Sequence, residues 1–135
     1  MGKTVVGLAS FSTEKLLVAV TVIGGAVALG MEVDMYLLLG GARAFRRDLQ
    51  YAASYEQPQL SRELLSGMKR AGVMNPFTSL EELKRDGGLR IHVCATAGKI
   101  WGAPHKENFS DLVDDVVGVA EYVSRCAEAD VVQVI

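Results

Sequence analysis

The sequence is poor in the residues from which most recognisable sites are built. It holds two cysteines, two histidines and one tryptophan in 135 residues. Cys94 and Cys126 are far apart, and no CxxC pair or Cys/His cluster at zinc-ligand spacing is present. We therefore expect neither a disulfide framework nor a metal site, and we expect both thiols to be reduced in a cytoplasmic protein.

An excess of basic residues is also missing. Fourteen Lys and Arg residues stand against sixteen Asp and Glu residues, which gives a formal net charge of −2. Such a chain has no surplus of positive charge with which to neutralise a phosphate backbone. Nucleic acid is therefore not an expected partner.

A hydrophobic run long enough to cross a bilayer is absent as well. Residues 16–31, LLVAVTVIGGAVALGM, carry no charge, but Lys15 and Glu32 close the run at both ends. A spanning helix needs about 20 apolar residues. We expect no stable membrane insertion, and we keep peripheral attachment through this segment as an alternative.

What the sequence does contain is an alternation of apolar, strand-like runs with helical stretches. The expected strands are 4–9, 32–39, 89–94, 115–117 and 130–135, and the expected helices are 13–28, a short one from 42, 62–71, 79–85 and 119–129. This alternation predicts an α/β fold: a three-layer α/β/α sandwich with a mainly parallel five-stranded sheet. We expect one domain over 1–135, with a helical excursion at about 40–88.

The first helix is expected to begin at a Ser12 or Thr13 cap and to end at Gly30. Gly24 and Gly25 fall in its middle, which we explain by close packing of the helix on the sheet. Because the helix is apolar nearly all round, we expect a partner subunit to cover its outer side. Farther along, Ser61 is expected to cap helix 62–71, and Ser79 with Glu82 to form a capping box.

The stretch RIHVCATAGKIWG, residues 90–102, carries the strongest chemical signal. It predicts a strand that ends at Cys94 and runs through small residues into a helix. Ligands of parallel sheets lie outside the carboxyl ends of the strands, and the N–H groups of a helix start favour a thiolate. Thr96 is expected to cap that helix, and Lys99 to add positive charge. This interpretation requires a solvent-open thiol, whereas a buried Cys94 is a packing residue.

The remaining candidates have weaker support. His92 lies two residues before Cys94 on the same strand face, where it is either a base or a satisfied, half-buried side chain. Gly40 and Gly41 with Arg43 form a possible anion-binding turn, although a solvated helix face is the commoner explanation. Cys126 is expected to pack on the inner face of the last helix with Val119 and Val123.

Two segments of the chain resemble a known family. The final third, LRIHVCATAGKIWG with DLVDDVVGVAEYVSRCAEADVVQVI, is similar to the DsrE/DsrF-like family of sulfur-relay proteins, and closest to its DsrE2/DsrE3-type branch, sometimes labelled peroxiredoxin-like. AVALGMEVDMYLLLGGARAFRR resembles the second-strand region of that family. The resemblance covers most of the chain except the middle excursion.

The resemblance implies an α/β/α sandwich that assembles as a homo-oligomer, a trimer or a hexamer, and needs no cofactor. It also implies a sulfur carrier or sulfurtransferase. Its cysteine, here Cys94, would take sulfane sulfur as a persulfide or thiosulfonate from a donor protein or small compound, and pass it to an acceptor thiol. Members with further cysteines after the strand differ from this chain, which has Ala95, Thr96 and Ala97 there. The alternative is a non-catalytic oligomeric module that binds a small anion and has a structural Cys94.

Overall fold

The computed structural model describes residues 2–49 and 58–135, with side chains from residue 62 onward in the second range. The five strands are β1 (Lys3–Leu8), β2 (Glu32–Leu37), β3 (Leu89–Cys94), β4 (Asp115–Val117) and β5 (Val131–Val134). The helices are α1 (Thr13–Ala28), α2 (Gly40–Ala44), α3 (Pro58–Ala71), α4 (Pro76–Arg85), α5 (Ala95–Ile100) and α6 (Val119–Glu128), with 3-10 turns η1 (Arg47–Leu49) and η2 (Lys106–Asn108).

The strands form one sheet in the order β4-β3-β2-β1-β5, and every neighbouring pair is parallel. The predicted α/β sandwich and its five-stranded sheet are therefore confirmed. The three central strands are the predicted apolar runs, because a parallel strand buried on both faces reads as a continuous apolar segment. β5 follows α6 back across the sheet and pairs with β1, so the last strand lies at the opposite edge from β4.

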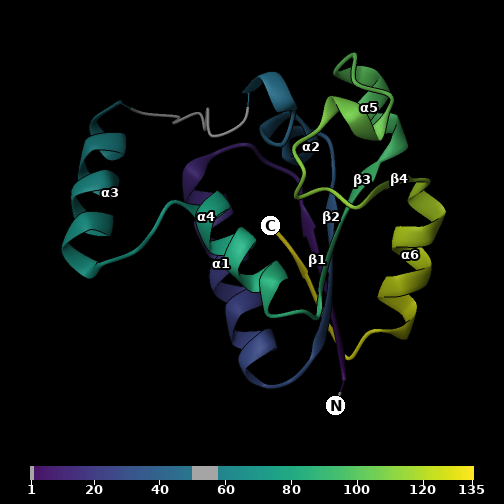
Figure 1. Ribbon diagram of the computed structural model, residues 1–135, viewed down its shortest axis with the longest axis horizontal. Coiled ribbons are helices and arrows are strands. Elements are labelled where there is room, and N and C mark those ends of the chain that lie inside the picture. The colour runs from purple at the N-terminus through teal and green to yellow at the C-terminus, as the bar shows by residue number, and fades with distance from the viewer. Residues whose placement is uncertain (1, 50–57) are drawn as a thin grey trace.

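Helices cover both faces of the sheet (Figure 1). α1 and α4 lie on one face and α6 lies on the other. Side chains alternate along a strand, so Met35 and Ile91 enter the core beneath α1 and α4, whereas Tyr36 and His92 face the side of α6. The larger apolar core thus fills the first face, and the buried titratable residues Asp34 and His92 lie on the second face.

The first residues of several helices differ from the sequence predictions. α1 is capped as expected, because the Ser12 side chain accepts a hydrogen bond from the Lys15 N–H. α4 begins earlier than predicted, at Pro76, where Asn75 accepts a hydrogen bond from the Phe77 N–H at 2.9 Å. Asparagine before proline is an equally good signal for a helix start, and the predicted capping box of Ser79 and Glu82 is therefore wrong.

α2 and α3 also begin before their predicted first residues. α2 starts at Gly40 rather than Ala42, and α3 starts at Pro58 rather than residue 62. Proline is well tolerated in the first turn of a helix, where its missing N–H costs nothing. The side chain of Ser61, the predicted cap of α3, lies outside the described residues.

The glycines of α1 and α2 play opposite roles. A Cβ atom added at Gly24 or Gly25 would meet nothing within 4 Å, so the predicted close packing of these glycines on the sheet is wrong. A Cβ atom at Gly41, in contrast, would come within 2.1 Å of the carbonyl oxygen of Leu8. Gly41 therefore allows the start of α2 to pack directly on the end of β1.

The outer side of α1 is only partly covered in the single chain, where Leu17 and Thr21 line a hollow shared with α3. Val18 is 47% exposed and Leu29 is 64% exposed. The uncharged run at 16–31 thus covers the sheet with one side only. Within the described ranges, no helix has the length and apolar character needed to cross a bilayer.

Candidate functional site

Cys94 is the last residue of β3 and also the N-cap residue of α5. Its backbone is extended, with φ −67° and ψ 124°, and its side chain makes no capping hydrogen bond. The predicted strand end and the predicted helix start therefore meet at one residue, with no loop between them. Its thiol lies at the carboxyl edge of the central part of the sheet, where parallel sheets bind ligands.

The predicted solvent-open thiol is not found, because Cys94 is only 8% exposed and belongs to the apolar core. α5 begins at the next residue, and its Ala97 belongs to the same apolar core. Ala97 and Gly98 of this helix are buried, and a Cβ atom at Gly98 would lie 2.7 Å from the carbonyl oxygen of Ala103. The turn at 98–103 is thus packed tightly against the helix.

Thr96 and Lys99 do not have the predicted roles. Thr96 lies inside α5 and is exposed, so it is not the cap. Lys99 is exposed in the last turn of the six-residue helix rather than beside its start. Because α5 begins at the residue that directly follows the strand, Thr96 and Lys99 both lie within the helix rather than at its cap.

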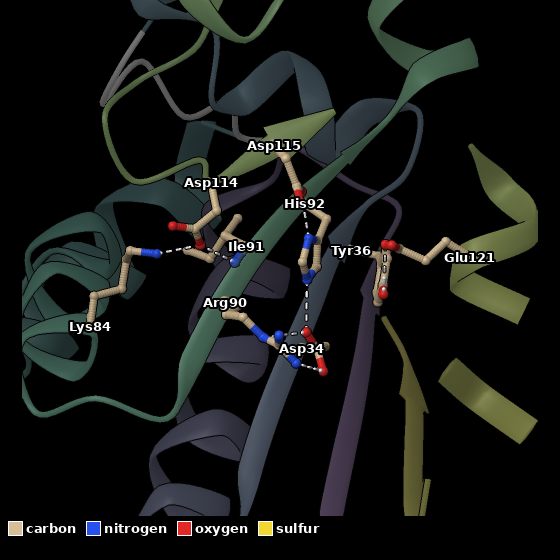
Figure 2. A network of polar contacts seen from close by, with 9 residues as sticks. All are labelled: Asp34, Tyr36, Lys84, Arg90, Ile91, His92, Asp114, Asp115 and Glu121. Carbon is tan, nitrogen blue, oxygen red and sulfur yellow. Dashed lines mark hydrogen bonds and ion pairs between the residues drawn. The ribbon is translucent and has the colours of Figure 1, made fainter. Parts of the chain in front are cut away.

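His92 lies at the centre of a buried polar network on the α6 side of the sheet (Figure 2). Its Nε2 atom is 2.7 Å from Oδ1 of Asp34 on β2, and its Nδ1 atom is 2.5 Å from Oδ1 of Asp115 on β4. Both ring nitrogens are therefore occupied by carboxylates. His92 has no free nitrogen to act as a base toward Cys94, and the alternative of a satisfied histidine is the one the structure supports.

The carboxylates around His92 favour its charged form. Burial alone would lower the pKa of His92, but hydrogen bonds to the carboxylates of Asp34 and Asp115 raise it above its ordinary value. Burial alone would raise the pKa of Asp34, yet the hydrogen bond from His92 and the charge of Arg90 lower it. Two carboxylates thus contact one imidazole ring, while Arg90 adds an ion pair with Asp34 at 3.1 Å.

Tyr36 extends this network toward α6. Its ring stacks on His92 with centroids 4.6 Å apart, and its hydroxyl donates a 3.2 Å hydrogen bond to Glu121. Burial and the nearby carboxylates of Glu121 and Asp34 raise the pKa of Tyr36, so its hydroxyl stays protonated. The network therefore connects β4, β3, β2 and α6 through side chains alone.

Asp114 forms a second polar contact at the start of β4. Its Oδ2 atom accepts hydrogen bonds from the Ile91 N–H at 2.7 Å and from the Lys84 ammonium at 2.5 Å. These bonds join α4 to β3 on the side opposite His92. The adjacent Asp114 and Asp115 thus fasten β4 to the sheet from both faces.

Asp34, Tyr36 and Asp115 were not among the predicted site residues. The sequence does carry a signal for two of them, because Asp34 and Tyr36 alternate with apolar residues along β2 and so share one face. Nothing in the sequence identifies the partner of Asp34 on β3. In the part of the chain that the structure describes, no set of three His, Cys, Asp or Glu side chains is arranged to hold a metal ion.

α6 lies on the sheet differently from the prediction. Val119 and Val123 are 54% and 59% exposed, so the expected inner face of this helix is wrong. Tyr122 points inward instead, and its hydroxyl would lie 2.6 Å from a Cβ atom at Gly7. The tyrosine ring fits because β1 offers a glycine there, and Cys126 is left half-buried.

The residues of the predicted anion-binding turn have two different roles. Gly40 and Gly41 are buried, and the space at both is filled by the end of β1 and the residues that follow it. Arg43 is half-buried with its guanidinium carbon 4.7 Å from the ring centroid of Phe11 and 5.9 Å from that of Trp101. The glycines therefore serve packing, and Arg43 alone retains a group for binding.

Comparison with known proteins supports the fold and nothing more specific. No family model matches the chain, and no curated protein matches it. The chain is similar to the solved structure of MTH1491 from Methanobacterium thermoautotrophicum, which is titled a protein of unknown function. The two share 17% sequence identity with a TM-score of 0.66, and the match covers 100% of each chain.

Proposed function

We propose that the protein is a sulfur carrier or sulfurtransferase that holds sulfane sulfur on Cys94. The observation that carries this proposal is the place of the thiol: the final residue of a central parallel strand, directly before a helix start, with no hydrogen bond from its own side chain to the backbone. The first N–H groups of α5 lack helical partners and favour negative charge on a bound sulfur atom.

The proposed reaction is two thiol–persulfide exchanges. The Cys94 thiolate attacks the outer sulfur of a donor RS–SH, which forms Cys94–S–SH, breaks the donor S–S bond and releases RS⁻. An acceptor thiolate then attacks the outer sulfur of the Cys94 persulfide, takes that sulfur, and leaves the Cys94 thiolate. Atoms and electrons balance without a metal, an organic cofactor or an external oxidant.

The proposed transfer requires a donor to reach a thiol that is mostly buried, and this requirement limits the donor. A residue that is 8% exposed favours a thin, unbranched donor such as inorganic polysulfide over a persulfide carried on a protein. A protein donor or acceptor would need α5 to move away from the strand end. We therefore place small sulfane-sulfur compounds before partner proteins, in a cytoplasmic setting that keeps the thiol reduced.

Intact mass spectrometry tests the proposal. Wild type, Cys94→Ser and Cys126→Ser are incubated with inorganic polysulfide, and then with a small thiol. We expect wild type and Cys126→Ser to gain sulfur and lose it to the thiol, while Cys94→Ser gains none. Equal loading of the two single variants would overturn the proposal.

The burial of Cys94 also favours one alternative, an oligomeric interaction module in which this cysteine only packs. Alkylation of the folded protein by iodoacetamide separates the two functions. In the carrier, Cys94 reacts in the folded state, and an excess of polysulfide protects it. In the alternative, Cys94 reacts only after unfolding, whereas the half-buried Cys126 reacts in both states.

A homo-oligomer, a trimer or a hexamer, is part of the proposal. The outer side of α1, where Val18 and Leu29 are exposed, supports it. Light scattering coupled to size exclusion measures the molar mass directly. A monomer at all accessible concentrations would contradict this part of the proposal and leave the Cys94 chemistry untouched.

A further inference from the structure

Arg43 lies in an aromatic cage built at the carboxyl edge of the sheet. Its guanidinium carbon is 4.7 Å from the centroid of Phe11 and 5.9 Å from the centroid of Trp101. Phe11 follows β1, Arg43 follows β2 and Trp101 follows β3, so the three central strands each supply one member. α2 and α5, which carry Arg43 and lead into Trp101, lie side by side at that end (Figure 1).

The charge of Arg43 has no partner within the described residues. Three other arginines there bind carboxylates: Arg46 binds Asp48, Arg47 binds Asp111 and Arg90 binds Asp34. For Arg43, the same described ranges supply aromatic faces but no hydrogen-bond acceptor. Aromatic contacts cover the flat face of a guanidinium group. The N–H groups along its edge stay available as hydrogen-bond donors. A half-buried cation with free donors is thereby ready for a ligand of opposite charge.

One ring of the cage is held by a hydrogen bond. The indole N–H of Trp101 donates a 2.7 Å hydrogen bond to the carbonyl oxygen of Leu39, which fixes the ring. Leu39 itself has φ 32°, a left-handed conformation that a non-glycine residue adopts only when its surroundings require it.

We propose that Arg43 is the binding residue of a small-oxyanion site. Its planar fork matches two oxygens of one phosphate, sulfonate or carboxylate group, and α2 places Arg43 at the carboxyl edge of the sheet. The site needs no contribution from Cys94, so it goes beyond the sulfur-transfer proposal and does not depend on it. Its ligand class is a small molecule with at least one such oxyanion.

Trp101 is the only tryptophan in the sequence, so its fluorescence reports on this cage. The full chain is titrated with inorganic phosphate, sulfate and acetate, with chloride keeping the ionic strength constant. We expect a saturable fluorescence change with at least one oxyanion and none with chloride alone. The same oxyanion is expected to raise the thermal midpoint, because a ligand of the folded state stabilises it.

Variants locate the binding. Arg43→Gln is expected to weaken the binding of the oxyanion at least tenfold. Arg43→Lys keeps the charge but not the planar fork, and we expect it to weaken binding less. The control Arg47→Gln alters an exposed arginine already paired with Asp111 and is expected to bind as wild type does. Cys94→Ser is expected to bind as well, which separates this site from the sulfur chemistry.

Two results would overturn the proposal. One is the absence of a saturable change with all three oxyanions in the wild type. The other is a thermal shift of equal size in wild type and Arg43→Gln, which would place the oxyanion elsewhere.

Discussion

His92 is bound to Asp34 across two neighbouring strands, with its Nε2 atom 2.7 Å from Oδ1 of the carboxylate. The register makes this contact diagonal, since His92 is paired with Tyr36 and Asp34 with Arg90. On its other side His92 reaches Asp115, its direct neighbour on β4. One imidazolium therefore joins three adjacent strands two residues before Cys94. We expect it to fix the position of the strand end that carries the thiol.

Replacing Asp34 by asparagine is expected to destabilise the protein strongly. The Asp34 side chain is 7% exposed and meets both His92 and Arg90. Removing one partner of a buried ion pair leaves the other charge uncompensated, which costs about 3 kcal/mol. Chemical denaturation of wild type and Asp34→Asn measures the difference in free energy of unfolding.

Asp115→Asn is the matched control, because its side chain is 50% exposed and water replaces part of the lost interaction. We expect it to cost about 1 kcal/mol or less. Equal losses for the two variants would show that the buried Asp34 contact is not the stronger link.

The raised pKa of His92 and the lowered pKa of Asp34 predict how stability depends on pH. The contribution of His92 is complete below its unfolded pKa of roughly 6.5 and is lost as pH rises through its higher folded pKa. The contribution of Asp34 is complete above its unfolded pKa of roughly 3.9 and is lost as pH falls through its lower folded pKa. The network thus stabilises most between these limits.

His92→Gln removes the titrating imidazole and is the variant that tests the alkaline side. Above neutral pH we expect the free energy of unfolding of the wild type to fall by up to about 1.4 kcal/mol per pH unit, because unfolding then releases one proton from His92. In His92→Gln this part of the slope should disappear. Parallel curves for the two proteins from pH 6 to pH 9 would argue against a charged His92.

Replacing a glycine by alanine is expected to change stability in opposite directions in α1 and α2. Gly41→Ala would place a Cβ atom 2.1 Å from the Leu8 carbonyl oxygen, so α2 must move away from β1. We expect a loss of about 2 kcal/mol or more, in the range of overpacked cores. Gly25→Ala meets nothing within 4 Å and lies inside a helix. There we expect a gain of about 0.5–1 kcal/mol.

Thermal and chemical denaturation of both glycine variants checks these signs. A stable Gly41→Ala variant would mean that the start of α2 yields easily. A destabilised Gly25→Ala variant would have a different meaning, namely that a neighbouring subunit packs closely on this part of α1.

Much of the fold could be predicted because the sheet is made of apolar runs. VVGL, VDMYL and IHVC are each buried on both faces, and this burial leaves the same mark in the sequence and in the structure. Helix starts were harder, since several residues near each start are good caps. Asn75 before Pro76 and Ser79 with Glu82 are both reasonable signals, and in the structure Asn75 is the residue that caps α4.

The site could be predicted only in part. The sequence placed Cys94 at the strand end, but it could not show that α5 would begin at the next residue or that Cys94 would be only 8% exposed. The pairing of His92 with Asp34 depends on the register of β2 and β3, which no short-range pattern determines. Val119 and Val123 misled the assignment of the inner face of α6, because Tyr122 reaches the glycine of β1 instead.

Peptide mapping of the wild-type protein tests the central claim most directly, because Cys94 and Cys126 then compete within one folded molecule. The protein is exposed briefly to less than one equivalent of inorganic polysulfide, alkylated and digested, and the extra sulfur is located by mass spectrometry. We predict that the peptide containing Cys94 carries the sulfur and that the peptide containing Cys126 does not. Extra sulfur mainly on Cys126, or divided equally between the two, would contradict the assignment of Cys94 as the sulfur-carrying residue.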